Sequence, residues 1–146
     1  MSRVLASALA VLCLVVAGCT QQPPAKSIEL TSHERSLTVE TFDEIMDAGK
    51  PVLVDFSATW CSPCMEAKPE IEALAKEMDG ELIVAVADMT KDDSPAGPIA
   101  TAWNVSGFPT LVLVQDRTEI GRSLGMPRGS LRDWVQKQLD RAGESG

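Results

Sequence analysis

Two cysteines three positions apart are the residues of this sequence best suited to carry out chemistry. Cys61 and Cys64 enclose Ser62 and Pro63 and follow an apolar stretch at 51–56. If that stretch is a strand and a helix begins at the pair, unpaired backbone N–H groups and the helix dipole stabilise a Cys61 thiolate. Cys64, one helical turn further along, is then placed to resolve a mixed disulfide. The spacing therefore predicts a redox-active pair in which Cys61 is the nucleophile.

Two other uses of the pair fit the sequence less well. A zinc site with this spacing normally needs a second pair of ligands. Beyond the first eighteen residues, the only other cysteine is Cys19 and the only histidine is His33. A structural disulfide across so short a loop removes little conformational entropy from the unfolded chain. We therefore expect no metal and no other cofactor.

The first nineteen residues have the pattern of a bacterial lipoprotein leader. Arg3 precedes an uncharged apolar run at 4–17, which is too short to span a bilayer and is typical of a signal peptide. The run ends at Val16-Ala17-Gly18-Cys19, which resembles a lipobox, where a cysteine is lipidated and becomes the new N-terminus. A leader that ends on a buried structural cysteine is the alternative, but the residues that follow Cys19 are polar.

These features predict three parts of the chain. Residues 1–18 are expected to be a lipoprotein signal peptide, 19–36 the lipidated Cys19 with a polar tether, and 37–146 the folded domain. The protein is then expected in the cell envelope, anchored to a membrane by lipid and facing the periplasm or another extracytoplasmic space. In such a chain, Cys61 and Cys64 are the only free thiols.

Length and charge narrow the remaining possibilities. A chain of 146 residues, 45% of them apolar, has room for one domain with a proper core. The formal net charge of −8 argues against a nucleic-acid partner, because phosphate binding requires clustered Lys and Arg. We expect a monomer that does not bind nucleic acid.

The apolar pattern predicts an α/β domain that positions the cysteine pair. Expected helices cover 41–49, 61–79, 98–103 and a last segment that begins after Ser130, and expected strands cover 51–56, 82–86, 110–114 and 119–124. The order αβαβαββα predicts a mixed sheet with helices on both faces.

The segment from Val54 to Cys64, Val-Asp-Phe-Ser-Ala-Thr-Trp-Cys-Ser-Pro-Cys, closely resembles the active-site sequence of thioredoxins. Pro69 and the later run Gly107-Phe108-Pro109-Thr110 extend this resemblance, which covers about residues 39–139. The resemblance implies a thioredoxin fold, with a central mixed sheet flanked by helices on both faces. It also implies an oxidoreductase that acts on disulfide-bonded client proteins.

The resemblance further implies roles for five other residues. Asp55 is expected to be a buried carboxylate that transfers protons for Cys64, since burial raises the pKa of such a group. A surface position for Asp55 is the alternative. Pro109 is expected to follow a cis peptide bond and, with Phe108, to dock an extended client segment. Trp60 and Gly125 are expected to flank the site and to contact the client.

The chain departs from the family pattern in two informative places. Val86 stands where many members have a lysine that faces Asp55, and no histidine lies between the cysteines, where strongly oxidising members tend to have one. We therefore expect a protein-disulfide reductase that a membrane electron donor re-reduces. An oxidase or isomerase of the same fold is one alternative, and a peptide-binding module with incidental cysteines is another.

Overall fold

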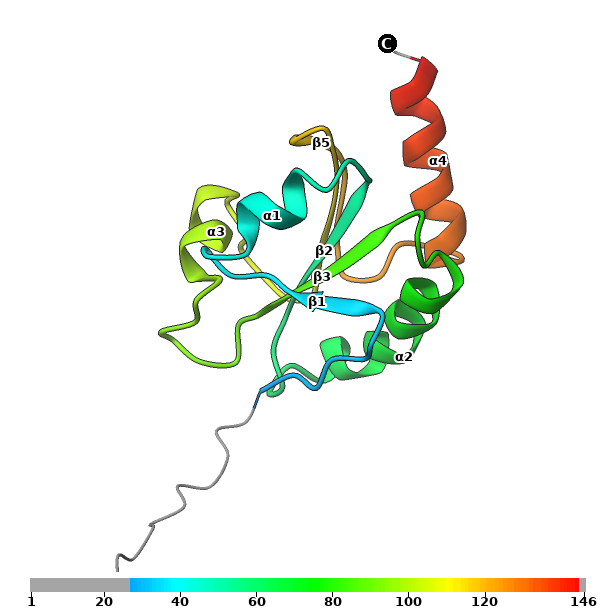
Figure 1. Cartoon of the computed structure of the whole chain (residues 1–146). Helices are drawn as coiled ribbons and strands as arrows, with labels where there is room; N and C mark the ends of the chain where they lie inside the picture. The colour runs from blue at the N-terminus through cyan, green and yellow to red at the C-terminus, as the bar shows by residue number, and fades with distance from the viewer. Residues whose placement is uncertain (1–26, 145–146) are drawn as a thin grey trace, which may run out of the picture.

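The computed structural model describes residues 27–144, which form one sheet flanked by helices (Figure 1). In chain order the elements are β1 (Glu34–Ser36), α1 (Phe42–Met46), β2 (Val52–Ser57), α2 (Ser62–Glu77), β3 (Ile83–Asp88), α3 (Gly97–Ala102), β4 (Thr110–Gln115), β5 (Thr118–Leu124) and α4 (Leu131–Glu144). The predicted signal peptide, Cys19 and the first part of the predicted tether lie outside the described residues. Within residues 27–144, no helix combines the length and the apolar character needed to cross a membrane.

β2 is the central strand of the sheet and leads directly to the cysteine pair. The strand order is β1-β3-β2-β4-β5, in which β1 and β3 run parallel to β2 and β4 runs antiparallel to it. Every residue of β2 is buried, as expected for a strand with neighbours on both sides and helices on both faces. This mixed sheet confirms the predicted fold class.

Helices cover both faces of the sheet and divide the core into two layers (Figure 1). Residues of α1 and α3 pack with Val54 and Phe56 on one face. Residues of α2 and α4 pack with Leu53 and Leu111 on the other. Because successive side chains of a strand point to opposite faces, Asp55 lies on the face that α2 covers.

Local residue chemistry explains the second half of the fold. Asp116 and Arg117 join β4 to β5 with φ angles of 48° and 60°, the left-handed pair that a two-residue hairpin turn requires. Ser130 Oγ accepts a hydrogen bond from the Asp133 N–H at 3.3 Å and so caps α4. The hairpin and the cap both lie where the sequence predicts them.

The folded part of the chain begins earlier than the sequence predicts. The predicted tether extends to residue 36, but Glu34–Ser36 forms β1, which pairs with β3 at the sheet edge. Still earlier, the Ile28 N–H donates to Asp88 Oδ2 at 2.8 Å, and Lys68 Nζ donates to the Glu29 carbonyl at 2.7 Å. The prediction is wrong for β1 because a short edge strand is held by backbone pairing and leaves no apolar pattern to detect.

Candidate active site

Cys61 occupies the N-cap position of α2. Its backbone is extended, and its sulfur accepts a hydrogen bond from the Cys64 N–H at 3.3 Å. Pro63 lies in the first turn, where its missing N–H costs nothing and its fixed φ suits a helix. The end of the helix therefore favours negative charge on the Cys61 sulfur.

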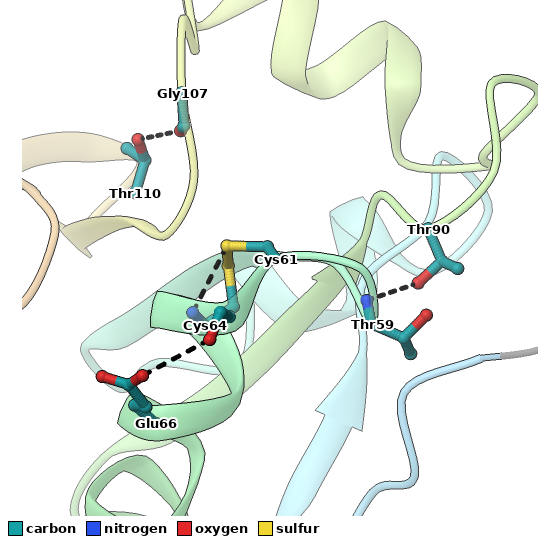
Figure 2. The surroundings of a disulfide bond; sticks show 8 residues. Thr59, Cys61, Cys64, Glu66, Thr90, Gly107 and Thr110 are labelled. Atoms are coloured by element: carbon teal, nitrogen blue, oxygen red, sulfur yellow. Dashed lines mark hydrogen bonds between the residues drawn. A yellow bond between two sulfur atoms is a disulfide. The ribbon is translucent and has the colours of Figure 1, made fainter.

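The two cysteines form a disulfide with a Cα–Cα distance of 5.2 Å (Figure 2). Cys64 is 1% exposed, whereas Cys61 retains 7%. Of the two sulfurs, that of Cys61 is therefore the one an incoming disulfide can reach more readily. The structure brings together the two thiols that the sequence singles out.

The single histidine of the sequence lies away from the cysteine pair. His33 lies 3.4 Å from Asp79, beyond the C-terminal end of α2 and far along the helix from the cysteines. Between residues 27 and 144, no group of three or more His, Cys, Asp and Glu side chains is arranged to hold a metal ion.

Asp55 is a buried carboxylate beneath α2. It is 5% exposed, and its Oδ1 has no hydrogen-bond partner among the described residues. Its neighbours in the sheet are Val86 of β3 and Leu111 of β4, which are both apolar. Burial raises the pKa of the Asp55 carboxyl to about 7, an effect that the Ser57 hydroxyl partly opposes. At neutral pH this group can therefore both accept and release a proton.

Two charged side chains act on Asp55 in addition to its burial. Glu34 raises the Asp55 pKa by like-charge repulsion, and Lys68 lowers it. Glu34 is itself buried on β1, while Lys68 lies on α2 and forms an ion pair with Glu72. The sequence analysis missed both residues, because only the packing of β1 and α2 against the sheet brings them toward Asp55. The cation that acts on Asp55 is therefore Lys68 of α2, while the position of β3 that faces Asp55 is occupied by the uncharged Val86.

The loop before β4 lies beside the disulfide. The Phe108–Pro109 peptide bond is cis, the geometry that the resemblance implies, and Phe108 packs against the cluster of Ala58 with the two cysteines. Neither the N–H nor the carbonyl of Phe108 forms a hydrogen bond within residues 27–144. An extended client segment can therefore pair with the Phe108 backbone as a strand pairs with an exposed edge.

Gly125 closes the same loop from the end of β5. Its N–H donates to the Pro109 carbonyl at 2.7 Å. Its φ of +76° lies in the left-handed region, and no atom lies within 4 Å of the position a Cβ would take. Backbone conformation, and not crowding, therefore explains the glycine in the described structure.

Trp60 is an exposed aromatic side chain at the rim of the site. It is 64% exposed, and its ring meets that of Phe108 edge to face at 5.8 Å. The indole Nε1 donates to the Thr90 carbonyl at 3.1 Å, and Thr90 Oγ1 accepts from the Thr59 N–H at 3.0 Å. Figure 2 shows Thr90 on the opposite side of the disulfide from the Gly107–Thr110 segment. Thr90 therefore orients the residues that directly precede Cys61.

The structure adds Thr90, Met89 and Leu124 to the predicted site. Thr90 and Met89 directly follow β3. Because the carboxyl ends of the parallel strands β2 and β3 meet at one edge of the sheet, the residues after β3 could have been expected near those after β2. Leu124 is 68% exposed at the end of β5, and its Cδ1 would lie 3.2 Å from a Cβ on Gly107. No local pattern indicates Leu124, because its place beside the loop depends on pairing between β4 and β5.

Comparison with known proteins shows similarity over most of the chain. The family model for thioredoxin matches residues 33–137. A thioredoxin of Mycolicibacterium smegmatis is 38% identical over 97 residues, which are 63% of this chain and 85% of that protein. Thioredoxin H2 of Arabidopsis thaliana is 33% identical over 118 residues, 81% of this chain and 84% of that protein. The X-ray structure of Fasciola hepatica thioredoxin superposes with a TM-score of 0.60 at 31% identity, covering 71% of this chain and 98% of that one.

Replacing Asp55 with Asn is expected to stabilise the oxidised protein more at pH 8 than at pH 4. The Asp55 pKa is raised from 3.8 to about 7 in the folded state, so the unfolded chain loses this proton first as the pH rises. The free energy of unfolding of the wild type therefore falls as the pH rises from about 4 to about 7, by about 4 kcal/mol once the change is complete. Urea unfolding of both proteins at the two pH values measures the difference.

Asp116→Asn, an exposed substitution in the β4–β5 turn, is the matched control and should change the unfolding free energy equally little at both pH values. The same stabilisation by Asp55→Asn at pH 4 and pH 8 would contradict a raised pKa.

Proposed function

The chain belongs to the thioredoxin family, and on that premise we propose that it reduces disulfides of client proteins outside the cytoplasm while a lipid on Cys19 holds it to a membrane. The family and the Cys61–Cys64 pair make it a protein-disulfide oxidoreductase with disulfide-containing clients. The observation that carries the proposal is Cys61 at the N-cap of α2, disulfide-bonded to the more deeply buried Cys64.

The proposed reaction proceeds in two exchange steps. The Cys61 thiolate attacks one sulfur of the client disulfide, so that a mixed disulfide forms and the other client sulfur leaves as a thiolate. Cys64 then loses its proton to the Asp55 carboxylate and attacks Cys61. The client leaves with both sulfurs reduced, and the protein retains the Cys61–Cys64 disulfide. Two electrons have then passed from the protein to the client.

Asp55 suits the second step because of its environment. A carboxyl with an ordinary pKa is too weak a base to deprotonate a buried thiol, whereas the raised pKa of about 7 brings Asp55 closer to a thiol. The unpartnered Oδ1 can take a proton without breaking a hydrogen bond within the described structure. This supports the role of Asp55 as the proton acceptor.

The reducing direction is supported by what surrounds the Cys61 sulfur. Its stabilising contact is the Cys64 N–H, and Ser62 and Pro63 add no cation. A more strongly stabilised thiolate would favour the reduced form and make the pair a better oxidant. The lone histidine, His33, lies beside Asp79 and cannot supply that charge.

The proposed location has its support in the first nineteen residues. The apolar run at 4–17 and the sequence Val16-Ala17-Gly18-Cys19 have the form of a lipoprotein leader. A reductase outside the cytoplasm needs a source of electrons after each turnover. We therefore propose that an electron donor in the membrane re-reduces Cys61 and Cys64.

We propose that the protein acts as a monomer. Large apolar side chains that are exposed in the described part of the chain are Leu30, Val39, Trp60 and Leu124. Two of the four, Trp60 and Leu124, lie at the rim of the active site, where they serve client contact. The remaining two are too few for a stable interface between copies.

Replacing Cys61 with Ser is expected to lower insulin disulfide reduction, with dithiothreitol as electron source, to the rate without protein. Replacing Cys64 with Ser should leave the first attack intact and accumulate client proteins in mixed disulfides, visible on a non-reducing gel. The control is the double variant Cys61→Ser/Cys64→Ser, which has no attacking thiol. Full activity of Cys61→Ser, or no more adducts with Cys64→Ser than with the double variant, would contradict the mechanism.

The reduction potential of the Cys61–Cys64 pair is expected to lie near the thioredoxin value of about −270 mV and far from the value of about −120 mV of a strong oxidant. Equilibration with glutathione measures it. Pro63→His places a cation between the cysteines and should make the pair more oxidising by at least about 30 mV. A wild-type potential near the oxidant value would assign the chain to protein oxidation instead.

Replacing Cys19 with Ser is expected to release the protein from membranes. In a bacterium that processes lipoproteins, the wild type should sediment with membranes and incorporate an alkyne-labelled fatty acid, and Cys19→Ser should do neither. Cys13→Ser, in the same leader but outside the lipobox, is the matched control and should behave as wild type. A wild-type protein that takes up no label would overturn the anchor.

A further inference from the structure

A groove of about 510 Å³ opens beside the active site, between the loop that follows β3 and the segment before β4. We refer to it as the β3–α3 groove. Its lining includes the apolar side chains of Met89, Pro98, Val105 and Phe108 together with the carboxylates of Asp92 and Asp93. Figure 1 shows this loop next to the end of the sheet from which α2 begins.

The groove is continuous with the disulfide site. Met89 and Phe108 line it and also pack against the cluster of Ala58, Cys61 and Cys64. A client that brings a disulfide to Cys61 and pairs with the free Phe108 backbone therefore extends into the groove. The residues of the groove are in this way placed to select among clients.

Hydrogen bonds within the loop hold its acidic residues in position. The buried Ser94 donates through Oγ to the Asp88 carbonyl and accepts from the Ala96 N–H, while its own N–H donates to the Lys91 carbonyl at 3.2 Å. The backbone from Lys91 to Ser94 thus forms a turn that carries Asp92 and Asp93. A client meets these carboxylates in a defined place, with little ordering of the loop upon binding.

The charge of the groove is uncompensated within the described structure. Asp92 and Asp93 are exposed, and neither forms an ion pair or a hydrogen bond with a side chain of residues 27–144. Lys91, the adjacent cation, lines a different hollow, together with Ser36 and Leu37. The two carboxylates therefore give net negative charge to a groove that is otherwise lined largely by apolar side chains.

We propose that the β3–α3 groove selects client segments that carry Lys or Arg, together with an apolar residue, within a few residues of the attacked cysteine. The apolar side chain packs on Met89 and Phe108, while the cation lies against Asp92 and Asp93. Opposite charges across such a contact raise the rate of encounter and disfavour acidic clients. This inference rests on the proposed reductase function and specifies its substrate class.

Two synthetic peptides test the proposal. Each contains the same small disulfide loop, flanked on one side by two lysines in the first peptide and by two glutamates in the second. At low ionic strength, the wild type is expected to reduce the lysine peptide with a kcat/KM about fivefold higher, and most of that preference should disappear in 0.5 M salt. The double variant Asp92→Asn/Asp93→Asn is expected to reduce both peptides at nearly equal rates.

A control variant separates local charge from net charge. Glu81→Gln/Asp116→Asn also removes two negative charges, but before β3 and after β4, at the end of the sheet opposite the cysteines. This variant should keep the wild-type preference for the lysine peptide. A preference that survives in Asp92→Asn/Asp93→Asn, or equal rates in the wild type, would overturn the proposal. So would a dimer that forms through this groove and loses activity with rising protein concentration. If neither peptide nor insulin is reduced, the reductase function fails, and the inference fails with it.

Discussion

The passage of the chain from β2 to α2 within four residues is the constraint on which the rest of the site depends. β2 is the central strand, so its end cannot move without disturbing both neighbouring strands and both helix layers. The last residue of this short connection is Cys61, which is the N-cap of α2. A rigid strand end thus holds a sulfur at a helix terminus, where backbone N–H groups favour its ionised form.

The same strand places a carboxylate where a stable protein would normally have an apolar residue. Asp55 is surrounded by apolar strands and has one oxygen without a partner in the described structure. Burial that raises its pKa from 3.8 to about 7 also destabilises the fold progressively as the pH rises between these two values. Such a group is useful to a protein that must deprotonate a buried thiol. Glu34 of β1 then raises that pKa further and Lys68 of α2 lowers it.

Prediction from the sequence succeeded where the signal lies in neighbouring residues. Within residues 27–144, four of the strands, the four helices, the hairpin at Asp116 and the cap at Ser130 follow from apolar spacing, turn residues and caps. β1 escaped detection because its three residues are polar and its stability comes from pairing with β3. Cys61, Asp55 and the Phe108–Pro109 bond lie where the family resemblance implies. Leu124 could not be found in the same way, since it joins the site only through the pairing of β5 with β4.

The Cys61–Cys64 pair, the strand before it and the helix after it are properties of a short stretch of chain, because three-residue spacing and apolar periodicity act over one or two turns. The surroundings of that stretch are a different matter. The charges that act on Asp55 come from Glu34 and Lys68, on separate elements. The β3–α3 groove reaches the cysteines through Met89 and Phe108, which lie far from them in the sequence. These residues come close to the site only because of how the strands pair and how the helices pack on the sheet. A pattern among neighbouring residues carries no information about such contacts between distant parts of the chain.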